Sequence, residues 1–276
     1  GADKAYKWES SGADGYTITE CEKDGVGTDV IMHLKADDEN ERYSDYLQAW
    51  KIMRLVKKYS DYIRWPIRMD VERPEMKETG EKNEDGSPKY ETVTKVERET
   101  INSQIPIWQR SKSEVTDEQC MEFYKEHWHD TTDPACVIRI NAEGQVSYKA
   151  MLFIPGRQLL DYMTSTYEPG PELYSSGVMI MEHCQDLLAE SFYFVRGIVD
   201  SPDLSLNISR EMLQHDRQLK LIAQNINKRI KSELTKMLAN DRPKYEEFYA
   251  NYGRQLRYGA VANYGQDIES LRELLL

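Results

Sequence analysis

The sequence predicts an α/β protein, with an α/β layer followed by a long helix and a small helical unit, and separate strands and a helix before the layer. Between residues 135 and 200, apolar strand-like segments alternate with a short helical one. Beyond residue 209 the apolar positions recur at helical spacing, at Leu219, Ile222, Ile226, Ile230, Leu234 and Leu238. A length of 276 residues allows two or three packed units.

The N-terminal part predicts three short strands, a helix and a fourth strand. The strands are at AYKWES, GYTITE and GTDVIMHLK, and the third alternates cleanly between apolar and polar residues. The helix is expected over 41–59, because Ile52, Leu55, Val56 and Tyr59 share one face. The segment YIRWPIRMDV alternates again, and Pro66 within it favours an edge strand or a bulge.

Residues 72–99 are the most charged stretch of the chain, with more than half of the positions acidic or basic. Such stretches are typical of linkers. Asp85 and Gly86, however, form a turn signal between two strand-like segments. A solvated hairpin and a disordered linker therefore both remain open.

The rest of the chain gives clear element signals. Thr116 and Gln119 form a capping box that predicts a helix over 117–128. Strands are expected at ACVIRI, QVSYKAMLFIP, GVMIMEH and FYFVRGIVD, with a looser stretch over 156–171 and a short helix near 184–190. The long helix is expected to end near Ala239, and Asp241 then caps a helical tail that has Pro243 in its first turn.

Composition excludes several classes of function. A net charge of −12 argues against broad binding to nucleic acid or to anionic membranes, although a local basic patch at NKRIKSELTK is left open. Without a signal peptide or an apolar run near 18 residues, a cytoplasmic location is expected. The four cysteines are scattered, and His127 and His129 lack a nearby third ligand, so neither a disulfide framework nor a metal site is predicted.

The chain contains no complete enzyme motif, but Arg210 is unusual for its position. It follows the cap residues Asn207 and Ser209 and so falls in the first turn of a helix, where the helix dipole disfavours a cation. One interpretation is an ordinary solvated arginine. The other is that Arg210 and the helix N-terminus together bind an anion such as a phosphate, in the manner of an arginine finger that completes another module's site.

Several segments carry a family resemblance. In order and spacing, PIWQRSKSEVTDEQCMEFYK, LFIPGR, FVRGIVDSPDLSLNISREMLQ and EEFYANYG resemble the middle segment of the 90-kDa heat-shock chaperone family, of the bacterial HtpG type. Upstream, KWESSGADGYTI, GTDVIMHLK and KKYSDYIRWPI resemble the last strands and helix of that family's nucleotide-binding domain. The resemblance covers essentially the whole chain.

The resemblance implies a domain organisation for this sequence. Residues 1–71 would be the C-terminal part of the ATPase domain and 72–99 the charged linker. Residues 100–239 would be a large α/β/α middle subdomain and 240–276 a helical one. The chain is then expected to be a fragment, and its residues 1–71 to be disordered or to pair with a second copy or with the hairpin, rather than to form an isolated sheet.

The resemblance also implies a function, that of an ATP-dependent molecular chaperone. In the family's closed dimer, the arginine at the Arg210 position reaches the ATP γ-phosphate, and the glutamine at the Gln214 position assists; Asn207 and Ser209 support the turn. ATP and Mg are expected in the full-length protein, which would be a homodimer through a C-terminal domain outside this chain. The fragment alone is expected to bind neither and to hydrolyse no ATP. The alternative is a protein-binding platform in which Arg210 is structural and pairs with Asp200 or Asp203.

Unfolded or partly folded client proteins are the second class of partner that the resemblance implies. The family match favours client contacts at Trp108, Leu160, Tyr249 and Tyr252. Relatives often carry an aromatic residue at the Leu160 position, which weakens that assignment. For the three aromatic residues, packing in the core is the alternative.

Overall fold

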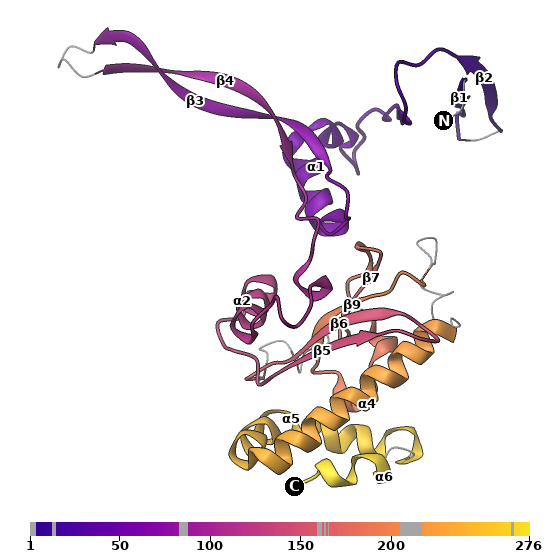
Figure 1. Ribbon diagram of the computed structural model, residues 1–276, viewed down its shortest axis with the longest axis vertical. Helices are drawn as coiled ribbons and strands as arrows, with labels where there is room; N and C mark the ends of the chain where they lie inside the picture. The colour runs from indigo at the N-terminus through magenta and orange to yellow at the C-terminus, as the bar shows by residue number, and fades with distance from the viewer. Residues whose placement is uncertain are drawn as a thin grey trace. The chain divides into compact units, whose positions relative to one another are not determined.

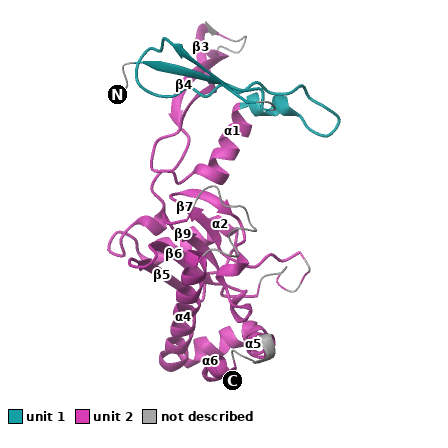
Figure 2. Cartoon of the chain, turned by 90° about the vertical axis from the view of Figure 1, so that its right-hand side faces the viewer, with its two compact units in different colours: residues 1–48 teal, residues 49–276 magenta. Residues whose placement is uncertain are grey.

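A computed structural model of the chain describes residues 4–12, 15–82, 88–158, 162, 164, 166–204, 217–265 and 268–276 (Figure 1). The chain forms two compact units, Gly1–Gln48 and Ala49–Leu276 (Figure 2). The boundary between the two units, after Gln48, lies inside the segment 1–71 that the resemblance assigns to one domain. The domain limits implied by the resemblance stay predictions.

The first unit is a small antiparallel sheet followed by a short turn of helix. Strands β1 (Ala5–Glu9) and β2 (Thr17–Cys21) pair with Trp8 opposite Ile18, and the 3-10 turn η1 spans Tyr43–Leu47. The third predicted strand is wrong: residues 27–35 form no strand, and Val30 and Met32 are 77% and 78% exposed. Alternation alone was not enough, because a strand also needs a neighbour that satisfies its backbone groups.

The expectation that this segment would not form an isolated sheet is also wrong. In the described residues, β1 and β2 pair only with each other. Their shared face carries exposed apolar side chains, those of Tyr6, Trp8, Tyr16 and Ile18.

The second unit begins with helical turns and a long hairpin. Helix α1 (Ala49–Leu55) continues into the π-helical turn η2 (Val56–Ser60), so the predicted helix over 41–59 is divided into shorter pieces. Strands β3 (Arg68–Lys82) and β4 (Pro88–Thr100) then form an antiparallel ribbon. Of the two alternatives left open for residues 72–99, the hairpin is therefore the one that the structure supports. The predicted strand YIRWPIRMDV starts only at Arg68, beyond Pro66, whose nitrogen has no hydrogen to donate.

The centre of the second unit is a five-stranded mixed sheet with the order β5-β6-β9-β7-β8. Four of its strands lie where the sequence predicts them, at β5 (Cys136–Ala142), β6 (Tyr148–Ile154), β8 (Val178–Met181) and β9 (Arg196–Asp200). The fifth, β7 (Glu172–Ser175), was missed because its sequence ELYS mixes polar and apolar residues, whereas the equally short β8 is the continuous apolar run VMIM. It pairs with β9 in parallel, whereas β9 and β6 are antiparallel.

Helices cover both faces of this sheet, which makes the predicted α/β/α layer. One face, with Ile138, Leu152 and Val199, packs on the buried stripe of α4 (Arg217–Asn240). The other face packs against α2 (Asp117–Trp128) and a loop with the turn η3 (Ile107–Gln109). The capping box of Thr116 and Gln119 is present in α2, as predicted.

A helical unit completes the chain. Helix α5 (Arg242–Gly265) is capped by Asp241, whose Oδ1 accepts a hydrogen bond from the Lys244 N–H at 3.2 Å. Beyond it lie α6 (Ile268–Leu271) and the turn η6 (Arg272–Leu274). The short helix predicted near 184–190 consists of two 3-10 turns, η4 (Gln185–Leu187) and η5 (Glu190–Phe192). The predicted start of the long helix lies outside the described residues.

Candidate functional site

The segment that carries the predicted anion site joins the end of β9 to α4. Its residues Asn207, Ser209, Arg210 and Gln214 lie outside the described residues, as does Leu160. Both flanks of the segment are described, and both are anchored in the core: Leu204 and Leu219 are 3% and 2% exposed.

Hydrogen bonds fix the flank on the β9 side. The Ser201 hydroxyl donates to the Ser147 carbonyl oxygen at 2.7 Å, and the Ser147 N–H donates to Asp203 Oδ2 at 2.7 Å. The Ser175 hydroxyl donates to the Leu204 carbonyl oxygen at 2.6 Å. The segment therefore starts from a fixed point just beyond the carboxyl end of β9, which runs parallel to β7.

The two carboxylates that the structural alternative would pair with Arg210 already accept hydrogen bonds from described residues. Asp200 is 2% exposed, and its Oδ2 accepts from Gln109 Nε2 at 2.7 Å and from Trp108 Nε1 at 3.3 Å. Asp203 accepts from the Ser147 N–H. Asp200 thus joins the η3 loop to the end of the central strand.

The structure places two of the predicted client contacts in the core. Trp108 is 3% exposed and Tyr252 is 1% exposed. The Tyr252 hydroxyl donates to the Arg157 carbonyl oxygen at 2.6 Å, and its ring stacks on Phe194 with centroids 4.6 Å apart. For both residues, packing in the core is the interpretation that fits their position here. Sequence alone could not separate the alternatives, because both depend on the same aromatic pattern.

Tyr249 is half-buried at the rim of the helical unit. Its hydroxyl donates to the Leu276 carbonyl oxygen at 3.1 Å, and the Arg257 guanidinium lies 5.6 Å from the ring centroid. Because Tyr249 is only half-buried, a client contact there stays a prediction.

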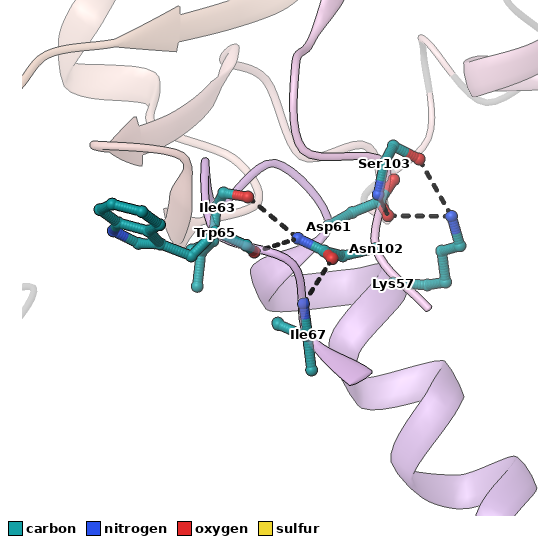
Figure 3. A network of polar contacts seen from close by, with 7 residues as sticks. All are labelled: Lys57, Asp61, Ile63, Trp65, Ile67, Asn102 and Ser103. Carbon is teal, nitrogen blue, oxygen red and sulfur yellow. Dashed lines mark hydrogen bonds and ion pairs between the residues drawn. The ribbon is translucent and has the colours of Figure 1, made fainter. Parts of the chain in front are cut away.

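Sequence reasoning missed a polar clamp at the base of the hairpin (Figure 3). The Asn102 side chain is 7% exposed and bonds three main-chain groups across the hairpin: Nδ2 donates to the carbonyl oxygens of Ile63 and Trp65 at 2.9 and 3.0 Å, and Oδ1 accepts from the Ile67 N–H at 2.8 Å. A single asparagine at the end of a charged stretch gives no signal for this role.

Asp61 forms the second half of the clamp (Figure 3). Its Oδ1 accepts from the Ser103 N–H at 2.8 Å and from Lys57 Nζ at 2.9 Å, and its carbonyl oxygen accepts from the N–H groups of Ser103 and Gln104 at 2.9 Å each. We refer to Asp61 and Asn102 together as the hairpin clamp. It ties residues 61–67 to residues 102–104.

No metal-binding group of three or more His, Cys, Asp or Glu side chains occurs within the described ranges. His127 Nε2 instead lies 2.7 Å from Glu172 Oε1. In the same part of the chain, none of the helices has the length and apolar character needed to cross a membrane.

The fold and the matched segments define a class of protein, the chaperone middle domain. The structure resembles the middle domain of a Plasmodium falciparum heat shock protein, with a TM-score of 0.53 and 25% identity over 62% of this chain and 64% of that one. A family profile described as Hsp90 protein matches residues 70–276. The chain therefore belongs to the Hsp90 family.

Bacterial relatives match the whole chain. Chaperone protein HtpG of Clostridium perfringens is 52% identical over all 276 residues, and that of Bacillus subtilis is 51% identical over the same length. The chain spans 43% of the length of each of these relatives.

Proposed function

We propose that this chain links ATP hydrolysis to client binding in a cytoplasmic, homodimeric chaperone. In this proposal Arg210 reaches the γ-phosphate of ATP held, with Mg, by the N-terminal domain of the full-length protein. Gln214 assists it, and Asn207 and Ser209 shape the turn. The observation that supports this most is that the described residues on either side of segment 205–216, Leu204 and Leu219, are both buried, and that Leu204 comes soon after the carboxyl end of β9.

It matters that the residues on either side of the segment carrying Arg210 are fixed, because an arginine acts on a transferred phosphoryl group mainly through its position and its charge. Its planar guanidinium can donate two hydrogen bonds to phosphate oxygens. Its benefit grows as charge develops in the transition state, so it is expected to raise the rate of hydrolysis more than the affinity for ATP. An arginine finger is worth roughly 10³- to 10⁵-fold in the GTPases where it has been removed.

The test is ATP turnover by the full-length protein with Arg210→Ala, measured beside its affinity for ATP. Turnover is expected to fall at least about tenfold while the affinity changes little. Arg217→Ala is the matched control, because Arg217 is an exposed arginine at the start of the described part of α4. Equal turnover by the Arg210→Ala protein and the unmodified protein would leave the platform alternative, with a structural Arg210.

Client binding is the second part of the proposed function. The helical unit supports it, because α5 presents Tyr258 and Val261 with 60% and 64% of their surface exposed. Among the predicted client contacts that the structure describes, Tyr249, on the same helix, is the one that stays partly accessible. We also expect the isolated chain to hydrolyse no ATP, and turnover by purified material would contradict this.

A further inference from the structure

A small cavity of about 160 Å³ lies in the α/β layer beside the start of β9. Its volume is below the roughly 300–1,000 Å³ of sites that take drug-sized ligands, so an occupant would have only a few heavy atoms. The charged and aromatic part of its lining consists of Trp128, Glu168, Glu172, Glu182, His183 and Arg196.

Arg196 enters this cavity because of its place in the sheet. It is the first residue of β9 and lies opposite Phe153 of β6, so the two side chains share one face. Phe153 packs against Trp128, the last residue of α2, with ring centroids 5.5 Å apart. Arg196 and Trp128 therefore meet at the wall of the cavity, on the face of the sheet that α2 covers.

The Arg196 guanidinium forms no hydrogen bond or ion pair with any residue that the structure describes. It carries a positive charge and five N–H donors at every pH at which proteins fold. The residue is only partly exposed, and a charge that has lost part of its water is costly unless a group of opposite charge replaces that water. The partner that Arg196 lacks is therefore an anionic group.

Two of the three carboxylates in the cavity wall already have partners. Glu172 Oε1 lies 2.7 Å from His127 Nε2, and Oε2 accepts a hydrogen bond from the Tyr174 hydroxyl at 3.0 Å. Glu182 forms an ion pair with Lys58. These two carboxylates keep the cavity acidic, but their closest contacts are already made.

The third carboxylate, that of Glu168, lies on a segment whose ends are held in place. In residues 166–170, the Tyr167 hydroxyl donates to the Tyr193 carbonyl oxygen at 2.9 Å. Gly170, at φ +119°, approaches the Cys184 main chain so closely that a Cβ on it would collide. The position of this segment beside the cavity is therefore fixed from both sides.

Glu168 itself is the carboxylate with the weakest partner. Its Oε2 lies 3.7 Å from His183 Nε2, and its side chain is 74% exposed. The cavity thus has a cation without a partner in the described residues, Arg196, and an acceptor with capacity left, Glu168.

We propose that this cavity binds a free α-amino acid with a small side chain, with its carboxylate on Arg196 and its ammonium group on Glu168. A guanidinium matches a carboxylate with two parallel hydrogen bonds. A simple anion would be repelled by the three carboxylates, and a simple cation by Arg196, whereas a zwitterion satisfies both ends. Trp128 offers an apolar wall for the Cα substituent. The inference does not depend on the proposed function.

The test is equilibrium dialysis of the full-length protein against radiolabelled L-alanine at fixed ionic strength. Saturable binding with a Kd of roughly 1–10 mM is expected for two partly exposed charged contacts. Arg196→Gln keeps a polar side chain but removes the charge, and it should weaken binding at least about tenfold. Glu168→Gln should weaken binding at least about threefold, and its exposed position covers the case in which Arg196→Gln does not fold.

The matched controls are Arg254→Gln and Glu126→Gln, because both side chains are exposed and lie outside the cavity. Both proteins should bind alanine as the unmodified protein does. Acetate and methylamine each carry one half of the zwitterion, and each should compete at least about tenfold less well than unlabelled alanine.

The absence of saturable alanine binding up to about 100 mM, ten times the weakest expected Kd, would overturn the site. Binding that is unchanged in both Arg196→Gln and Glu168→Gln would place the ligand elsewhere and overturn it as well. Acetate that competes as well as alanine would overturn the assignment to an amino acid. None of these measurements involves ATP, Arg210 or a client, so a failure here is distinct from a failure of the proposed function.

Discussion

The hairpin clamp gives the sharpest prediction about stability, at Asn102→Ala. The substitution removes three hydrogen bonds of 2.8 to 3.0 Å and leaves the Ile63 and Trp65 carbonyl oxygens and the Ile67 N–H without that partner. Each such bond contributes about 0.5–1.5 kcal/mol in net terms. Trp65 is 65% exposed, so water can replace the bond to its carbonyl oxygen. The other two bonds then leave a loss of about 2 kcal/mol.

This loss should be local, and hydrogen exchange of single amides is the suitable assay. About 2 kcal/mol corresponds to roughly 30-fold faster exchange of the Ile67 amide, which loses its acceptor. The Met151 amide, at the centre of the sheet, should exchange at the unmodified rate. Asn225→Ala is a matched control because Asn225 is an exposed asparagine on α4. If the Ile67 amide keeps its protection in Asn102→Ala, the side chain is not what holds the base of the hairpin.

Two further predictions concern the α/β layer. Burial alone would raise the pKa of Asp130, but hydrogen bonds from the Tyr124 hydroxyl and from the N–H and hydroxyl of Thr132, with Arg157 nearby, together lower it. The Asp130 carboxylate therefore stabilises the fold at pH values above the pKa that it has in the unfolded chain, and this stabilisation is lost as the pH falls through the lowered pKa of the folded state. Asp130→Asn should lower the free energy of unfolding in urea by about 1–3 kcal/mol at pH 7. The difference between the two proteins should shrink in acid. Gly197, at φ +151°, lies so close to the Met151 carbonyl oxygen that a Cβ would collide with it; Gly197→Ala should lower the midpoint of urea unfolding by the equivalent of at least about 2 kcal/mol, and an unchanged midpoint would contradict this packing.

The elements predicted well from sequence are those whose signal is local. The capping box at Thr116 places the start of α2 because both of its hydrogen bonds are made within four residues. The buried stripe of α4 follows from a 3.6-residue period sustained over many turns, although Met237 takes the buried position expected of Leu238. The four apolar runs recognised in the sequence give four of the five strands of the sheet.

The elements predicted poorly depend on partners far away in the sequence. Strand β7 exists because β9 and β8 pair with its two edges, and its four residues carry too little pattern to show this. The segment GTDVIMHLK has the pattern of a strand but lacks the partner. Burial of Trp108 depends on Asp200 and Tyr62, which lie 92 and 46 residues away, and no local rule finds such contacts.

In the candidate site, too, sequence reasoning found the residue with a local signal and missed those that depend on distant partners. Arg210 stood out because a cation at a helix start conflicts with a local rule. The hairpin clamp conflicts with none, and its residues become meaningful only when the two sides of the hairpin are seen together (Figure 3).

The clamp also has a consequence for how this protein can change over evolutionary time. The ends of the ribbon, next to Ile67 and Ile101, are held together by the Asn102 side chain and by the bond from the Ile101 N–H to the Ile67 carbonyl oxygen at 2.9 Å. With its ends already joined, each doubling of the chain between them adds only about 0.6 kcal/mol of closure entropy. Insertions and deletions between residues 68 and 100 should therefore accumulate among relatives almost without a penalty to the α/β layer, provided that the asparagine at the base is kept.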